Sequence, residues 1–401
     1  MITRALLERV FSAASIERWN DCPHPAVFTE LGKQGHKMVI AWVLGCHEEN
    51  QGHAVDWLTL IEGGIFEFLH RVVVTDIRPP VFHKLMRNRD TREELNDWVS
   101  RNLESELAGL PGLFARRFRE YHHSQVATLE RRILQAAHYL ATKWEFGFIL
   151  HWSAGMYGIE QTQQEIESPI ETIDLVAARE MLLAPKSSKL WRFVSLVGQL
   201  TFQKRWAQTP RIPQTSVLGH LLFVAVTAYL LSIEIGACPR RVYNNFFGGL
   251  FHDLPEVLTR DIVSPVKASG LGELIHHYER EAMESRFAPL LPQPWYEELC
   301  YYTEEEFTNK TWRKGRGTLQ RHKGDIPKEM NQDEYNPIDG QLIELCDKLA
   351  AYIEASASIR LGIRPQALED GKRGIYERFS SAILYGYPAG RLFDLFNNDS
   401  D

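Results

Sequence analysis

The sequence has few cysteines and no cysteine motif. Its five cysteines are scattered, and no two of them form a C-x-x-C pair: Cys22, Cys46, Cys238, Cys300 and Cys346. Disulfide frameworks and zinc sites use cysteines in paired, regular spacings. The odd, unpatterned set therefore predicts reduced thiols and a cytoplasmic compartment.

Long apolar segments are also missing. The N-terminus, MITRALLERVFSAASIERW, lacks the apolar core of a signal peptide. The longest apolar run, Leu221–Ser232, is shorter than the ~20 residues that cross a bilayer, so we expect a buried helix there. The net charge of −7 is small for 401 residues and argues against a general nucleic-acid binder. The sequence thus predicts no membrane insertion and no stable nucleic-acid partner.

Patterns typical of β-strands are scarce. The segment VVVTDI near residue 72 is β-branched, but it is short and fits a helix equally well. Apolar residues instead recur at helical spacing in residues 92–107, 124–143, 171–184, 188–206 and 338–360. The sequence therefore predicts an all-α fold.

The length suits two domains of common size. Pro185-Lys186-Ser187-Ser188 is the favoured boundary, because such residues interrupt helices. We expect a helical domain over residues 1–165, a linker over 166–187, and a second domain over 188–401. A polar insertion is expected at 303–337.

Four polar residues lie in or beside segments that should be buried. His220 opens one apolar stretch, His252 and Asp253 end another, and Asp347 lies within LIELCDKLAAYIEA. Any one of them alone fits a core hydrogen bond or a surface carboxylate. Together, two imidazoles and two carboxylates from three helices predict a metal site, since buried charges are paired or bound to a metal. A metal there indicates hydrolysis by an activated water.

The order of these motifs resembles the HD superfamily of metal-dependent phosphohydrolases, and within it the bacterial 5′-deoxynucleotidases. The motifs that carry the resemblance are Arg205-Trp206, His220, the block HDLPEVLTRDIVSPVK from His252 to Lys267, and Asp347. The resemblance implies an HD-domain helical bundle with one divalent ion bound by His220, His252, Asp253 and Asp347. This donor set accepts Mn, Co, Fe, Ni, Zn or Mg and does not choose among them.

The resemblance also implies two catalytic carboxylates. Glu256 would take a proton from the attacking water or protonate the leaving oxygen. The alternative for Glu256 is a capping box with Asp253. Asp261 would lie at the active site, or it would cap the turn before Ser264-Pro265.

Three residues are expected to bind substrate. Arg205 would bind phosphate through two nitrogens, Trp206 would form a wall of the sugar or base pocket, and Lys267 would add charge near the phosphate. Their alternatives are a surface arginine, a core tryptophan and a solvated lysine. The pair His276-His277 is either part of a second metal site or an exposed pair on a helix. We favour the exposed pair.

A basic segment, KTWRKGRGTLQRHK at residues 310–323, has six lysines or arginines and no acidic residue. It fits a solvated loop, or a lid that binds the phosphates of a larger substrate. The lid would extend the substrate range to a nucleoside triphosphate or a guanosine polyphosphate.

The two halves show a similar order of motifs. The first half has Arg18-Trp19, His36, Asp76 and His138, and His36 precedes Asp76 by 40 residues, as His220 precedes Asp261 by 41. The alternative is chance similarity between helical segments. We predict a duplication in which His36 matches His220, Asp76 matches Asp261 and His138 matches Asp347. The first copy has no HD pair, because IFEFLHRVV stands in its place, so it should be degenerate.

The sequence thus predicts a metal-dependent phosphohydrolase with a small-molecule phosphate ester as partner. The first-choice substrate is a (deoxy)nucleoside 5′-monophosphate. Alternatives are a nucleoside triphosphate, a cyclic nucleotide, a guanosine polyphosphate, or a non-catalytic nucleotide sensor. A homo-oligomer is compatible with the sequence.

Overall fold

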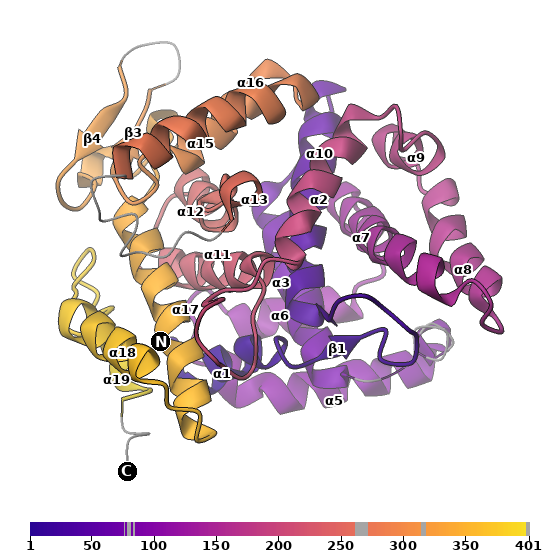
Figure 1. Cartoon of the computed structure of the whole chain (residues 1–401), viewed down its shortest axis with the longest axis horizontal. Helices are drawn as coiled ribbons and strands as arrows, with labels where there is room; N and C mark the ends of the chain where they lie inside the picture. The colour runs from indigo at the N-terminus through magenta and orange to yellow at the C-terminus, as the bar shows by residue number, and fades with distance from the viewer. Residues whose placement is uncertain (76, 78–81, 83–84, 261–271, 314–317, 398–401) are drawn as a thin grey trace. The chain divides into compact units, whose positions relative to one another are not determined.

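The computed structural model describes residues 1–75, 77, 82, 85–260, 272–313 and 318–397. Helices dominate these residues, and the sheets found among them are two short antiparallel strand pairs. The all-α prediction is therefore confirmed. The chain divides into two compact units, Met1–Val194 and Ser195–Asp401 (Figure 1).

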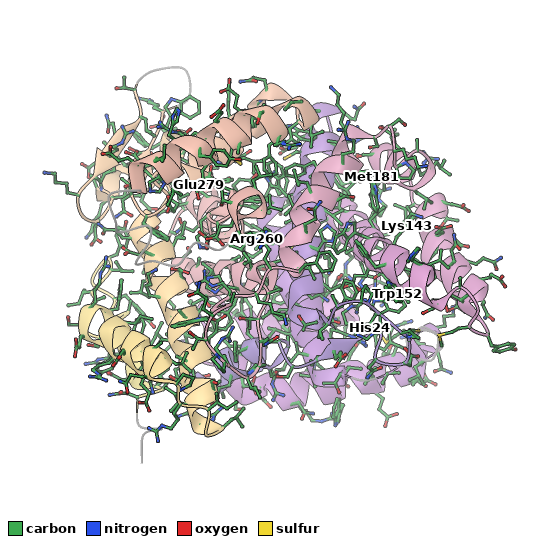
Figure 2. The ribbon with its side chains drawn as sticks, in the orientation of Figure 1. His24, Lys143, Trp152, Met181, Arg260 and Glu279 are labelled. Carbon is green, nitrogen blue, oxygen red and sulfur yellow. The ribbon has the colours of Figure 1, made fainter. Side chains whose placement is uncertain are left out.

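The N-terminal unit is a bundle in which α2 packs along α7 and α3 contacts both. Lys143 of α7 forms an ion pair with Glu167 of α8 (Figure 2). The residues expected to be a linker hold the end of α8 and all of α9, and both helices contact α7. The elements are α1 (Arg4–Ser12), β1 (Glu17–Arg18), β2 (Phe28–Thr29), α2 (Glu30–Asn50), α3 (Trp57–Val74), α5 (Arg89–Leu107), α6 (Phe114–His123), α7 (Leu129–Ser153), α8 (Ile159–Thr172), α9 (Val176–Leu183) and α10 (Lys189–Gly198), which crosses the boundary.

The C-terminal unit is built around α11, which packs against α12 and α17. These two helices also contact each other, so three helices surround one point. The elements are η1 (Gln199–Thr201), α11 (Val217–Glu234), α12 (Pro239–Phe251), α13 (Glu256–Thr259), α15 (Gly272–Arg286), η2 (Ala288–Leu290), α16 (Gln293–Thr303), β3 (Asn309–Thr311), β4 (Gln320–His322), η3 (Lys328–Met330), η4 (Asp333–Tyr335), α17 (Gly340–Arg360), α18 (Gln366–Phe379) and α19 (Arg391–Asp394).

Helix α11 is the core helix of this unit. Ser216 caps its first turn by accepting a hydrogen bond from the Gly219 N–H at 3.0 Å. The helix is longer than the apolar run in the sequence, and among the described residues it alone is long and apolar enough to cross a membrane. However, 89% of it is buried within the protein, which is typical of a core helix.

A glycine lets α12 approach α11 closely. A Cβ atom on Gly249 would lie 3.0 Å from the Ala225 Cα and 3.1 Å from its backbone nitrogen. A side chain there would require the Ala225 backbone to shift by a few tenths of an ångström, so Gly249 lets the end of α12 pack closely on the middle of α11. His252 follows α12 directly and His220 lies in the first turn of α11.

The polar insertion at 303–337 contains the β3–β4 hairpin, in which Asn309 pairs with His322. Lys310, the first residue of the basic segment, is buried in this hairpin. Its ammonium donates to the carbonyls of Tyr301, at 2.7 Å, and Glu304, at 2.6 Å, at the end of α16. Lys310 therefore satisfies the last carbonyls of a helix and is not available to a phosphate.

Candidate metal centre

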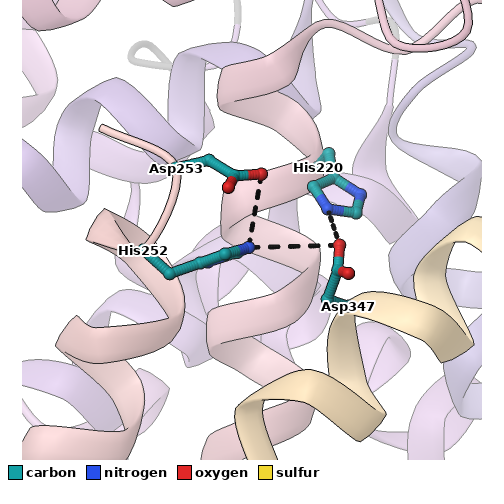
Figure 3. Close-up of side chains that lie close together, drawn as sticks. All are labelled: His220, His252, Asp253 and Asp347. Atoms are coloured by element: carbon teal, nitrogen blue, oxygen red, sulfur yellow. Dashed lines mark hydrogen bonds and ion pairs between the residues drawn. The ribbon is translucent and has the colours of Figure 1, made fainter. Parts of the chain in front are cut away.

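Four side chains meet where α11, α12 and α17 come together (Figure 3). They are His220, His252, Asp253 and Asp347, and one ligand atom of each lies within 4.8 Å of the others. The two imidazoles and Asp347 are buried, and Asp253 is half-buried. The structure thus brings together the four residues that the sequence predicted as ligands.

His252 directs its Nε2 toward this cluster. Its Nδ1–H donates to the Gly249 carbonyl at 2.9 Å, so in the neutral ring the lone pair is on Nε2. Nε2 has no hydrogen-bond partner, and it lies 3.4 Å from the Asp253 Oδ2 and 4.0 Å from the Asp347 Oδ1. A buried nitrogen that is left with a lone pair facing two carboxylates fits a metal ligand.

His220 is oriented by carboxylates on both sides. Its Nε2 lies 2.8 Å from the Asp347 Oδ1, and its Nδ1 lies 3.7 Å from the Glu354 Oε1. Glu354 is itself buried and accepts hydrogen bonds from the Trp206 indole, at 3.0 Å, and from the Thr215 hydroxyl. A carboxylate behind the distal nitrogen holds a histidine in the tautomer that a metal requires.

Asp347 is ionised in the fold. Burial raises its pKa, but Lys348 and the hydrogen bond from His220 outweigh burial and hold the pKa well below its usual range. The Lys348 ammonium lies 2.7 Å from the Asp347 Oδ2. The Oδ1 atom faces both histidines, so the carboxylate offers one oxygen to the cluster and one to the lysine.

Arg205 borders the metal cluster. Its guanidinium nitrogens lie 3.7 Å from the Asp253 Oδ2 and 3.5 Å from the Asp347 Oδ1. These distances exceed those of tight charge-assisted hydrogen bonds, which are about 2.7–2.9 Å, so neither carboxylate holds the guanidinium tightly. The guanidinium nevertheless lies beside the cluster, within reach of an anion bound there.

Trp206 contacts both a buried carboxylate and an apolar cluster of the C-terminal unit. Its indole N–H donates to Glu354, and its ring packs against Ala355, Ile359 and Leu368 of α17 and α18. These contacts give Trp206 a part in orienting Glu354. Its contact with a sugar or base remains a prediction.

Glu256 is the first residue of α13 and is 2% exposed. The helix begins after Pro255 without any side-chain cap, so the capping box with Asp253 is not formed. The Glu256 N–H instead donates to the Asp253 carbonyl at 3.0 Å, which holds Glu256 one turn from the metal cluster. The capping-box alternative is thus wrong, and the proton-transfer role remains a prediction.

Asp261 and Lys267 lie outside the described residues. His276 is 61% exposed at its side chain and faces Glu279, its neighbour on α15, at 3.4 Å. Its pair with His277 is not part of any cluster with metal-ligand geometry in the described chain. The exposed-pair interpretation is therefore the one that the geometry supports.

A cavity of about 490 Å³ is lined by neighbours of His252 and Glu256, although none of the four clustered side chains lines it. Phe307, which lines it, lies 5.9 Å from the His252 ring between centroids. Pro255, also in its lining, immediately precedes Glu256. Glutamates dominate the charged part of the lining: Glu279, Glu304, Glu305 and Glu306, with Arg280 and Arg321.

Sequence reasoning missed Glu354 and Lys348. Glu354 lies seven residues, or about two helical turns, after Asp347 on α17, so both share one face. That spacing could have identified it from the sequence. Lys348 follows Asp347 directly and shows no such pattern.

The donor set fits a divalent metal. It offers two imidazole nitrogens and two carboxylate oxygens, a mixture common to transition-metal and magnesium sites. Residues 197–375 match the HD domain family model, and HD domains bind divalent metals and are typically metal-dependent hydrolases. No curated protein and no solved structure was found to match the chain.

Proposed function

We propose that the HD domain at residues 197–375 hydrolyses a nucleotide phosphomonoester, with a (deoxy)nucleoside 5′-monophosphate as its substrate. One observation supports this most: a buried two-histidine, two-carboxylate cluster lies within reach of one arginine and one buried glutamate. A bound divalent ion would lower the pKa of a water and offset the negative charge of a phosphate.

Each side chain in or beside the metal cluster has a role in the proposed reaction. His220, His252, Asp253 and Asp347 would hold the ion. Arg205 would bind two phosphate oxygens and orient the phosphorus toward the attacking water. Glu256 would hold the proton that passes from that water to the leaving 5′ oxygen.

The cavity lined by Pro255 and Phe307 favours a monoester over a polyphosphate. Its glutamates would repel additional phosphates, whereas an uncharged nucleoside fits a volume of about 490 Å³. Three of the six cations of the basic segment already have partners or are buried. Lys310 is buried, Arg313 pairs with Glu334 at 2.8 Å, and Arg321 pairs with Glu305 at 2.6 Å.

A phosphate-release screen tests this proposal. The full chain would be incubated with nucleoside mono-, di- and triphosphates, cyclic nucleotides and guanosine polyphosphates, each with Mn²⁺, Co²⁺, Zn²⁺ or Mg²⁺. We expect the highest kcat/KM for 5′-monophosphates. A faster reaction with a polyphosphate would replace the substrate assignment, and nucleotide binding without phosphate release would indicate a sensor.

A further inference from the structure

The segments that lead into α2 and α11 are built alike. In each, the residue before an Arg-Trp pair lies antiparallel to the residue that caps the next helix: Glu17 opposite Thr29, and Lys204 opposite Ser216. Both tryptophans have a left-handed backbone, with φ of 61° for Trp19 and 56° for Trp206. Each indole N–H donates to a buried glutamate on a late helix. Trp19 bonds to Glu145 of α7 at 2.8 Å, as Trp206 bonds to Glu354 of α17 at 3.0 Å.

The two helices then begin in the same way. Thr29 caps α2 and Ser216 caps α11, and each accepts a hydrogen bond from the N–H three residues later. Lys33 is the fourth residue after its cap, and His220 is the fourth after its own. Lys33 therefore occupies in α2 the position that His220 occupies in α11.

The late helices repeat the match. His138 lies seven residues before the tryptophan-bound Glu145, and Asp347 lies seven residues before Glu354. His138 thus occupies the position of Asp347.

The residues at these matching positions contact each other in both units. The Lys33 Nζ lies 2.6 Å from the His138 Nδ1, and the His220 Nε2 lies 2.8 Å from the Asp347 Oδ1. In both units the first turn of one helix thereby touches the middle of the late helix at the same pair of positions.

A pair of glycines locates the positions in the N-terminal unit that match His252 and Asp253. Added Cβ atoms on Gly64 of α3 and Gly249 of α12 would collide with Met38 and Ala225, which lie at matching positions of α2 and α11. In the C-terminal unit, His252 and Asp253 follow the second glycine by three and four residues.

Counting in the same way from Gly64 gives Glu67 and Phe68. Arg71 lies seven residues after Gly64, as Glu256 lies seven residues after Gly249, so Arg71 occupies the position of Glu256. A phenylalanine thus replaces one proposed ligand, and a cation replaces the proposed proton-transfer carboxylate.

We infer that the N-terminal unit is a second HD-type copy whose metal site has been replaced by an internal network of lysine, arginine and carboxylate side chains. Lys33, Glu67, Phe68 and His138 take the four ligand positions, so this copy binds no metal. The chain then has one metal centre, which is the one in the C-terminal unit.

The charges of the network explain why no ion is needed. Arg18 lies 2.9 Å from both Glu30 and Glu145, and Lys37 forms an ion pair with Glu67. Fixed cations thus already neutralise the carboxylates that would otherwise attract a metal.

His36 is not the counterpart of His220, contrary to the prediction from sequence. Its Nε2–H donates to the Val194 carbonyl at 2.8 Å, and its ring packs edge-on against Trp144. These contacts make His36 a core residue. Asp76, the predicted match of Asp261, lies outside the described residues.

Restoring a ligand tests this inference in the full chain. Lys33→His would place an imidazole beside His138 and Glu67, a donor set of two nitrogens and one carboxylate that suits zinc-type ions. We expect the variant to bind one more equivalent of Co²⁺ than the unchanged chain, seen in metal content and in the visible spectrum. Lys33→Gln should add none, and His138→Ala should abolish the gain. A folded Lys33→His chain without extra Co²⁺, or a gain that survives His138→Ala, would overturn the assignment.

A second measurement tests the contact between Lys33 and His138 even if Lys33→His does not fold. His138→Asp would recreate the carboxylate of Asp347 opposite Lys33, and His138→Asn is its neutral control. We expect Tm to be roughly 2–4 °C higher for Asp than for Asn, and the difference to vanish when Lys33→Gln is added. Equal Tm values with Lys33 in place would show that the two side chains do not face each other.

Discussion

At the scale of single residues, the metal cluster depends on side chains that do not bind the metal themselves. Glu354 lies behind His220, the Gly249 carbonyl fixes the tautomer of His252, and Lys348 holds one oxygen of Asp347. Such partners tune metal affinity and ligand orientation. The site is therefore prepared for an ion before any ion binds.

Glu256→Gln separates proton transfer from metal binding. The amide keeps the size of the carboxylate but cannot carry the proton, so kcat should fall by roughly 10²–10⁴-fold. Metal content and KM should stay close to those of the unchanged chain. Glu273→Gln, on α15, is a matched control that should change neither value. A kcat near that of the unchanged chain for Glu256→Gln would remove this residue from the mechanism.

The sequence was sufficient to identify some of the site residues but not others. The apolar surroundings of four polar residues and the order of the HD motifs identified the side chains that the fold brings together, because buried polar groups need partners. Under the inferred correspondence, Lys33 rather than His36 matches His220, and the match of His36 gave residue type more weight than spacing. Lys33 follows Arg18 by fifteen residues, as His220 follows Arg205, and that equal spacing was already present in the sequence.

At the scale of elements, the close contact between α11 and α12 positions the first two histidines. The periodicity of apolar residues does not show how closely two helices approach each other, so the role of Gly249 was not predictable. The same applies to the β3–β4 hairpin, where a run of basic residues predicts a solvated loop or a lid and the fold buries its first residue, Lys310, against α16.

Gly249→Ala should force α11 and α12 apart. The new methyl group would meet the Ala225 backbone at 3.0–3.1 Å, which cannot yield as a flexible side chain can. We expect a loss of about 1–3 kcal/mol in the free energy of unfolding and weaker metal binding, measured by denaturant titration and metal titration. Gly147→Ala, where a Cβ meets nothing within 4 Å, should instead stabilise by about 0.5–1 kcal/mol. Equal effects at the two positions would contradict the account.

The buried contact between α3 and α5 makes stability depend on pH. His70 lies 3.1 Å from the Asn96 side-chain oxygen, and burial lowers the pKa of His70 to about 4. The unfolded chain binds this proton more tightly, with a pKa of about 6.5. The stability that His70 contributes is thus complete above pH 6.5 and is lost as the pH falls toward 4.

Replacing His70 tests this dependence. His70→Gln should flatten the decline of the free energy of unfolding between pH 6.5 and 4 by up to about 3 kcal/mol. Denaturant titrations at several pH values give this slope. An identical slope in the variant and the unchanged chain would show that His70 is not held neutral in the fold.

At the scale of the whole molecule, the two units have the same arrangement of motifs and opposite chemistry at matching positions. The C-terminal unit gathers two carboxylates and two imidazoles at one point, whereas the N-terminal unit gathers lysine, arginine and glutamate side chains in pairs. The first arrangement needs an added cation and the second does not. The inferred duplication therefore predicts a single metal site per chain.

The most direct test of the central claim measures metal content and phosphate release together in the unchanged chain and in Asp253→Asn. The substitution keeps the shape of the side chain and removes a ligand charge, while the helical fold, checked by circular dichroism, should persist. We expect about one divalent ion per unchanged chain. We also expect the variant to lose both the ion and the hydrolysis of a deoxynucleoside 5′-monophosphate, down to the level of metal-stripped protein. An Asp253→Asn chain that keeps its ion and its rate would contradict the proposed metal centre.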